Sequence, residues 1–249
     1  LTVFNELTWD IAANASFLSN TMENFAGFLE AGGLNGQGLT GAFSQVVTNN
    51  QPIYSYYMYE FRGYDSNGAS IYADAAGADA SLGLAAKKLV GKTGLPKMNL
   101  GFSTNVTYKN FDAAVSFYGA FGHYLYNNTA NAFFTAGAFN TTRNVLPETL
   151  TSGEALGASA AASTRFLEKG DFVRLQNLSL AYDMPLSGKG VFKSMVFSVT
   201  GQNLFLMTDY SGLDPEVSSA TGGNLPSIGM DYGAYPNPSK ITFGINAKF

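Results

Sequence analysis

Two residue types that commonly serve in nucleophilic catalysis are scarce or absent in this sequence. His123 is the only histidine, and cysteine is absent from all 249 residues. A serine–histidine–aspartate site in its usual form and a cysteine–histidine site are therefore not expected. Without cysteine, disulfides and thiolate metal sites are impossible. We expect no catalytic residues, no metal and no cofactor, and a protein that is not an enzyme.

Two groups of acidic residues are candidates for binding a cation. Asp65-Ser66-Asn67-Gly68 resembles part of a calcium loop, but the acidic residue that closes such a loop is missing, so a turn is the better interpretation. Asp214, Glu216 and Asp231 could hold a cation or pin their own segment, and we favour pinning. With neighbouring tyrosines they form a set able to stack on and hydrogen-bond a polar ligand or partner: Tyr210, Asp214, Glu216, Asp231, Tyr232 and Tyr235.

These residues must be positioned by regular secondary structure, and the clearest pattern for it lies in the last ten residues, KITFGINAKF. Apolar and polar or small side chains alternate there, and the apolar set is Ile241, Phe243, Ile245, Ala247 and Phe249. A period of two over about ten residues is typical of a membrane-spanning β-strand. The terminal aromatic residue resembles the ending of bacterial outer-membrane barrels, so we predict that Phe243 and Phe249 belong to the barrel-assembly signal.

The same alternation recurs along the chain and predicts about seven spanning strands. They are placed near residues 5–18, 52–62, 97–109, 112–126, 172–184, 194–207 and 240–249. In the second, Tyr54, Tyr56, Tyr57 and Tyr59 are interpreted as an interfacial aromatic girdle, with sugar stacking as an alternative. The polar positions are small and uncharged, which suits a water-filled lumen better than the charged exterior of a soluble sheet.

The alternation also predicts which residues share a face. We expect the following to face lipid: Leu100, Phe102, Val106, Phe197, Val199, Phe243 and Ile245. We expect the following to face the lumen: Asn99, Ser103, Thr107, Ser198, Thr200, Thr242 and Asn246.

Composition agrees with this interpretation. Charged residues make up 13% of the sequence, against about 25% in soluble domains. No run approaches the ~20 apolar residues of a spanning helix. The net charge of −4 argues against nucleic acid as a partner, because nucleic acid attracts basic surfaces.

Connection lengths predict the orientation of the strands. The links near residues 109–111 and 185–190 are short, whereas 65–96, 127–171 and 208–239 are long. Outer-membrane barrels place short turns in the periplasm and long loops outside. Strand parity places the first connection, residues 19–51, on the periplasmic side. We expect a short helix within residues 77–92, and His123 in the wall or a loop near the outer interface.

Seven strands do not close a barrel sensibly, because an open edge in lipid leaves backbone groups unpaired. Bacterial barrels have even strand counts, and large transporters have 22 strands and a plugged lumen. The remaining strands must come from upstream residues or from other chains. No signal peptide is recognised at the start of the sequence, and we interpret the chain as the C-terminal part of something longer.

Four stretches resemble the C-terminal end of the SusC/RagA family of TonB-linked outer-membrane transporters from Bacteroidetes. They are GLPKMNLGFSTNVTYKNFDAAVSFYGAFGHYLYN (residues 94–127), STRFLEKGDFVRLQNLSLAYDMP (163–185), VTGQNLFLMTDYSGLDPEVS (199–218) and GMDYGAYPNPSKITFGINAKF (229–249). They occur in the family's order, and Ala181 stands where glycine is commoner. Residues 19–50 match least.

This resemblance implies a fold and an activity. The fold is an all-β transmembrane antiparallel barrel, with residues 1–249 as the C-terminal part of a 22-stranded plugged barrel domain. The implied activity is TonB-dependent import of a large nutrient, a glycan or an oligopeptide, across the outer membrane. The implied partners are a SusD-like surface lipoprotein and TonB, the latter through a plug and TonB box that are not in this chain.

Two alternatives stay open at this point. One is a structural barrel within a larger envelope or secretion assembly, and the other is a passive porin. A plug with a TonB box would favour import, whereas the absence of any plug would favour the porin. The substrate is not identified by the sequence.

Overall fold

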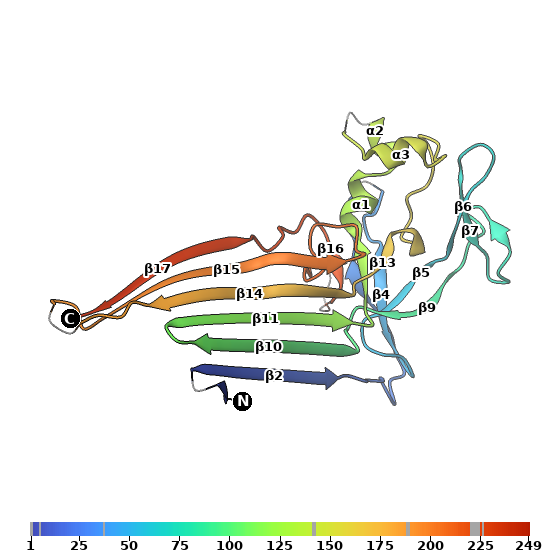
Figure 1. The fold of residues 1–249 in the computed structure, drawn as a ribbon. Helices are drawn as coiled ribbons and strands as arrows, with labels where there is room; N and C mark the ends of the chain where they lie inside the picture. Colours follow the sequence, from blue (N-terminus) through green and yellow to red (C-terminus); the bar gives the residue numbers. More distant parts are fainter. Residues whose placement is uncertain are drawn as a thin grey trace.

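The chain forms two parts, a long curved sheet and a compact group of small elements at one end of it (Figure 1). These are seen in a computed structural model that describes residues 2–4, 6–36, 38–140, 143–187, 190–219, 225 and 227–249. We call the long sheet the wall. We call the group at its end the loop body, which is built from the described residues of 18–97, 122–171 and 209–239.

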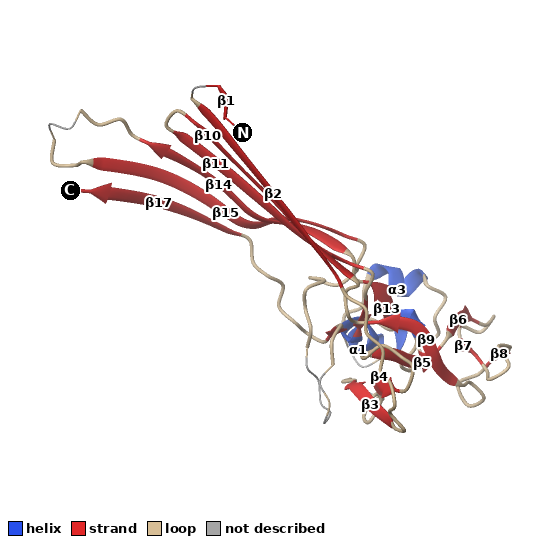
Figure 2. Cartoon of the chain, turned by 90° about the horizontal axis from the view of Figure 1, so that it is seen from below, coloured by secondary structure: helices blue, strands red, loops and turns tan. Residues whose placement is uncertain are grey.

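The wall is a seven-stranded antiparallel sheet in the order β1-β2-β10-β11-β14-β15-β17. Its strands are β1 (Thr2–Phe4), β2 (Leu7–Phe17), β10 (Met98–Tyr108), β11 (Phe111–Phe121), β14 (Phe172–Asp183), β15 (Ser194–Thr208) and β17 (Lys240–Lys248). Figure 2 shows the wall twisting and curving along its length, as expected of right-handed strands in part of a barrel.

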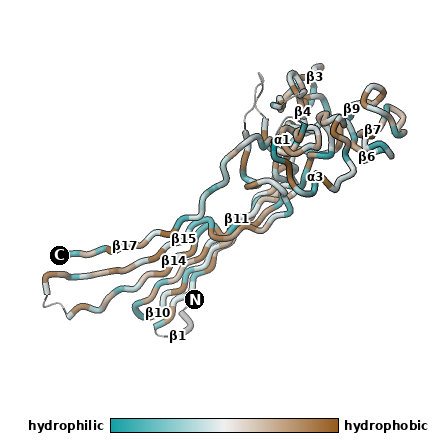
Figure 3. Tube along the Cα trace, turned by 90° about the horizontal axis from the view of Figure 1, so that it is seen from above, coloured by the Kyte–Doolittle hydropathy of each residue, from teal (hydrophilic) through white to brown (hydrophobic). Residues whose placement is uncertain are grey.

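Cross-strand partners share a face, so the register tests the predicted faces. One apolar row runs across five strands and consists of Val106, Ala113, Leu180, Val199 and Phe243. The neighbouring row is polar or small and consists of Asn105, Ala114, Ser179, Thr200 and Thr242. The two predicted sets therefore lie on opposite faces, and Figure 3 shows apolar and polar residues alternating along the strands.

No part of the described chain covers the apolar face. Phe243 is 82% exposed and Ile245 is 71% exposed, and Phe102 is exposed on the same face. A continuous apolar surface of this kind is a liability in water, whereas hydrocarbon solvates it. The register and the exposure together favour a wall whose apolar face meets lipid.

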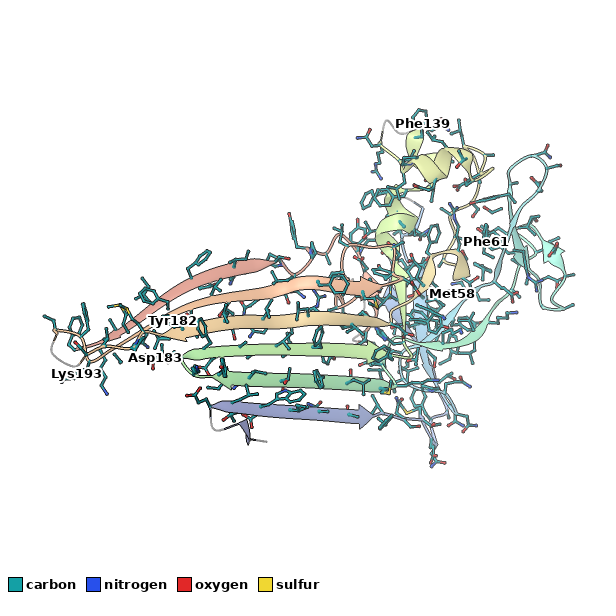
Figure 4. All side chains as sticks on the ribbon, viewed as in Figure 1. Met58, Phe61, Phe139, Tyr182, Asp183 and Lys193 are labelled. Atoms are coloured by element: carbon teal, nitrogen blue, oxygen red, sulfur yellow. The ribbon has the colours of Figure 1, made fainter. Side chains whose placement is uncertain are left out.

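One predicted spanning strand is wrong. Residues 52–62 contribute β5 (Ser55–Tyr59) to the loop body instead of the wall. Tyr56 and Met58 are fully buried there, and Met58 lies away from the wall strands (Figure 4). The aromatic girdle at these positions is therefore also wrong. Alternation shows that one face of a strand is buried, but it does not distinguish a protein core from lipid.

The predicted orientation of the first connection is wrong for the same reason. Residue Phe17 pairs with Met98, so the whole segment between β2 and β10 leaves the wall at the end where the other long segments leave it. Asp183 and Lys193 lie at the opposite end (Figure 4), and the described residues of the predicted turn 185–190 lie between them. Residues 188 and 189 of that turn are outside the described residues.

The loop body contains three small sheets. One consists of β3 (Phe28–Gly33), β4 (Phe43–Thr48), β5 and β9 (Lys87–Thr93), and a second of β6 (Phe61–Tyr64), β7 (Ser70–Ala73) and β8 (Asp79–Ala80). The third consists of β12 (Tyr124–Asn127), β13 (Leu167–Lys169) and β16 (Met230–Asp231). The helix expected within residues 77–92 is replaced by β8 and part of β9, and the strand expected at 112–126 is divided at Gly122, which has φ +78°.

Short helices complete the loop body: α1 (Asn128–Phe133), α2 (Ala136–Phe139), α3 (Pro147–Thr151) and a 3₁₀ turn at Thr164–Phe166. Within the described part of the chain, no helix has the length and apolar character needed to cross a membrane. The turn expected at Asp65 is confirmed, because its Oδ1 accepts hydrogen bonds from the Asn67 and Ala69 N–H groups, both at 2.8 Å.

The main buried cluster lies in the loop body and joins its three chain segments. Its members are Leu34, Leu39, Tyr56, Met58, Tyr126, Ala162, Phe166 and Met230. The Tyr56 hydroxyl lies 2.9 Å from the Tyr124 carbonyl oxygen and 2.8 Å from that of Gly229. Gly229 has φ +81°, and a Cβ atom there would lie 2.7 Å from the same hydroxyl. A glycine is therefore required where the three segments meet.

The assignment of the two faces predicts unequal costs for the same substitution on each face. Phe243→Arg should lower the free energy of unfolding by about 2–4 kcal/mol, because it places a charge in hydrocarbon. Asn246→Arg, on the opposite face of the same strand, should be nearly neutral. Unfolding of the full-length barrel in lipid vesicles would measure both, and equal costs would contradict the assignment.

Candidate ligand-contact site

Arg174 in β14 anchors the segment between β15 and β17. Its Nη2 lies 2.5 Å from Asp214 Oδ1, and its Nε lies 2.5 Å from Glu216 Oε2. Asp214 also accepts hydrogen bonds from the N–H groups of Glu216 and Asn237, each at 2.9 Å. Arg174 and Asp214 are buried, whereas the Glu216 side chain is 29% exposed. Both carboxylate oxygens of Asp214 are therefore used in holding the segment in place.

A bulge in β14 allows Arg174 to reach this position. The register with both neighbouring strands shifts between Leu175 and Asn177. Strict alternation would place Arg174 on the same face as Leu178. Because of the extra residue, Arg174 faces inward opposite Tyr118, while Leu178 stays on the apolar face. Bulges that re-aim a side chain are common next to functional sites.

Tyr210 and Asp231 form a second anchor. The Tyr210 hydroxyl donates to Asp231 Oδ2 at 2.7 Å, and the Thr129 hydroxyl lies 3.3 Å from Asp231 Oδ1. Burial, together with the Asp231 carboxylate, raises the pKa of Tyr210, so the phenol stays protonated and acts as a donor. These contacts connect the last long segment to the start of α1.

The remaining tyrosines of the predicted set differ in exposure. Tyr232 stacks on Phe133 of α1, with ring centroids 5.8 Å apart and an interplanar angle of 21°. Tyr235 is 95% exposed and is accessible to a partner or substrate. Contact of this set with a substrate or partner stays a prediction.

The cation alternative receives no support from this geometry. Asp214 and Glu216 contact Arg174, whereas Asp231 contacts Tyr210 and Thr129. Across the described ranges, no group of three or more histidine or acidic side chains is arranged to hold a metal ion. The contacts agree with the interpretation that these residues pin their segment.

A cavity of about 190 Å³ lies between the inner face of the wall and the last long segment. Tyr118 and Ala120 of β11 and Phe172 of β14 line it from the wall, and Glu216 lines it from the segment. His123, which follows β11, also lines it and is 4% exposed. Burial lowers the pKa of His123, and the nearby Asp171 carboxylate only partly opposes this, so the imidazole is neutral at pH 7.

Among these residues, sequence reasoning singled out Glu216 as a contact candidate, but it did not identify Arg174 or the rest of the cavity lining. The signal for Arg174 was a lone basic residue within the strand FVRLQNLSLAYD. A charge in a spanning strand is expensive unless it is paired, and this rule points to buried acidic partners. No comparable signal marks His123, because the cavity is formed by segments distant in sequence.

Of the two aromatic residues in the predicted assembly signal, one lies within β17 and the other directly follows it. Phe243 is in the apolar row, and Phe249 follows the strand and is 70% exposed. The Phe249 ring contacts that of Phe192, with centroids 5.1 Å apart. A role in assembly stays a prediction.

Similar proteins support the same interpretation. The chain is 32% identical over 233 residues to the TonB-dependent receptor P3 of Formosa agariphila, covering 83% of this chain and 23% of that receptor. It is 27% identical over 270 residues to the TonB-dependent receptor SusC of Bacteroides thetaiotaomicron, covering 99% and 25%. No family model matches the chain.

Solved structures show the same fold. The structure of the RagAB peptide transporter matches with a TM-score of 0.73 and 24% identity, over 99% of this chain and 28% of that one. The RagAB peptide importer in its open-open state matches with a TM-score of 0.76 and 23% identity, over 99% and 27%. The chain thus spans about a quarter of the length of these proteins. The predicted all-β transmembrane antiparallel barrel segment is confirmed.

The buried position of Arg174 predicts a large effect of its removal. Arg174→Met should destabilise the full-length protein by about 3–5 kcal/mol, because it leaves the buried Asp214 carboxylate without its cation. It should also make residues 208–239 sensitive to added protease. The matched control is Arg62→Met, whose partly exposed pair with Glu60 should contribute at most about 1 kcal/mol. Similar effects of the two substitutions would show that Arg174 is not an anchor.

The assembly signal can be separated from simple packing. Deletion of Phe249 should reduce the heat-modifiable folded form of the full-length protein in outer-membrane fractions. Phe192→Ala removes the same ring contact but leaves the last strand intact, so it should have a smaller effect. Equal losses would mean that packing alone explains the role of Phe249, and normal folded levels after deletion would contradict the prediction outright.

Proposed function

The chain belongs to the SusC/RagA family of TonB-dependent receptors, and we propose that the whole protein imports a large nutrient, a glycan or an oligopeptide, across the outer membrane. The match to a SusC receptor over 99% of this chain is the observation that carries the proposal. In this proposal residues 1–249 are the C-terminal part of the barrel domain. The protein acts as a receptor and transporter in the outer membrane, crossing it many times.

The proposal includes parts that lie outside this chain. The wall has two edge strands, β1 and β17, and an edge in lipid must be paired. A complete barrel of 22 strands with a plug would pair both edges. TonB would supply energy through the plug and TonB box at the N-terminal end of the whole receptor.

We further propose that a SusD-like surface lipoprotein is the partner. All long segments of the described chain leave the wall at one end and form the loop body (Figure 1), and in outer-membrane barrels the long loops face outside. The loop body also exposes large apolar side chains on α2, α3 and nearby residues, namely Phe139, Leu146, Leu150 and Leu156. Exposed apolar groups of this kind suit protein contacts.

Isolation of the full-length receptor from the outer membrane of its own host tests this proposal. A lipoprotein should co-purify, and shortening the long segments within 65–83 or 135–157 should weaken its recovery. Lys109→Ala, in a short turn at the opposite end of the wall, should leave recovery unchanged.

Growth on glycans or peptides should also fall when the gene is deleted. If no lipoprotein co-purifies and growth is unchanged, nutrient import is wrong and a structural role in an envelope assembly becomes the better explanation. A full-length protein without a plug would instead favour a passive porin.

A further inference from the structure

We infer that the cavity lined by His123 and Glu216 is a subsite for a primary ammonium group carried on an apolar body. The inference rests on the proposed import function, because it treats the cavity as a place where part of an imported molecule sits. It assigns a ligand chemistry to that place from charge, hydrogen bonding and shape.

The position of the cavity fits a subsite. Tyr118 and Ala120 face inward from β11 and pair with Arg174 and Phe172 of β14, so the floor of the cavity is the inner face of the wall near its loop end. Residues 215–218 and 228–229 cover it from the last long segment. Its volume of about 190 Å³ is below the roughly 300 Å³ of a typical small-molecule pocket. It therefore takes one group of a ligand and not a whole nutrient.

The charge beside the cavity favours a cation. Arg174 contributes one positive charge, whereas Asp214 and Glu216 contribute two negative charges, so the cluster carries a net charge of −1. Both Asp214 oxygens already have partners within the protein. Glu216 binds Arg174 through Oε2 and also lines the cavity. An ammonium group next to Glu216 would offset the unbalanced negative charge in a partly buried site.

A second feature of the cavity is His123, which is one of its lining residues. Among the described residues its Nδ1 is one of the few buried side-chain nitrogen atoms without a hydrogen-bond partner, although the residue is 4% exposed. A neutral imidazole offers one nitrogen as an acceptor. A buried polar atom without a hydrogen-bond partner is destabilising, and an ammonium group on a ligand would supply the missing donor.

The rest of the lining selects the body that carries the ammonium group. Most of the wall and cover is apolar and consists of Pro96, Ala120, Leu125, Phe172, Pro215, Val217 and Ile228. A sugar ring would lose hydration at its hydroxyl groups against these surfaces. A carboxylate would be repelled by the net negative charge. In an aromatic or aliphatic amine, the ammonium group would pair with Glu216 and the apolar body would pack on the apolar lining.

Fragment binding to the purified full-length receptor in detergent tests the inference, with ligand-observed NMR as the readout. The probes are 2-phenylethylamine, its neutral analogue 2-phenylethanol, and glucosamine, which carries an ammonium group on a polar body. The amine should bind at least about tenfold more tightly than the alcohol, a difference of about 1.4 kcal/mol. Glucosamine should not compete with the amine.

Three variants locate the binding site. Glu216→Gln keeps the shape of the cavity and leaves Arg174 paired with Asp214, so it should remove the preference for the amine over the alcohol. Val217→Phe should fill the cavity and weaken binding of both probes. The matched control is Glu148→Gln, an exposed residue of α3 outside the cavity, which should change nothing.

The outcomes are distinct. Equal binding of amine and alcohol by the unmodified receptor would overturn the inference, as would amine binding that survives Val217→Phe. Effective competition by glucosamine would overturn the assignment of an apolar body. The assay needs neither lipoprotein nor transport, so its failure would leave co-purification and growth results standing, and failure of those would leave a measured fragment affinity intact.

Discussion

Backbone hydrogen bonding across the wall is the constraint on which the rest of the structure depends. In hydrocarbon an unpaired N–H or C=O group costs several kcal/mol, so every spanning residue must pair with a neighbouring strand. β10 meets this requirement residue by residue, from Met98 to Tyr108, with β2 on one side and β11 on the other. Once this register is set, the side-chain period of two divides the wall into a lipid face and an inner face.

The same constraint places irregular structure at the ends of the strands. The chain segments of the loop body cannot cross the membrane zone as loose backbone, so they gather at one end and build a core of their own. That core resembles the interior of a water-soluble domain, with Tyr56 and Met58 fully buried. The wall, in contrast, keeps its large apolar residues exposed. One chain therefore follows two opposite burial rules, one for residues that meet lipid and one for residues that meet protein.

Arg174 is the point at which the two parts are connected. A charged side chain on the wall is tolerated because it faces inward and is neutralised by Asp214 and Glu216. The connection holds the last long segment over the inner face and thereby creates the cavity beside His123. The anchoring residues are thus part of the architecture that shapes the ligand space, while Tyr235 and the cavity lining present the surfaces that a ligand could meet.

The sequence by itself determined the local features. Period-two alternation located six wall strands to within a few residues and assigned the sides of Phe102, Phe197 and Phe243, because lipid and lumen impose opposite polarity on alternate positions. The Asx-type turn at Asp65 was also readable, because its hydrogen bonds are made within five residues.

Only the tertiary structure decided the features that depend on distant partners. Residues 52–62 alternate like a spanning strand, yet they pack on protein, since a half-buried strand looks the same against either surface. The β14 bulge places Arg174 on the opposite face from Leu178. The extra residue, Gln176, is not of a type that would predict a bulge. The pairing of Arg174 with Asp214, 40 positions later, and the cavity formed with His123 arise from chain segments that only folding brings together.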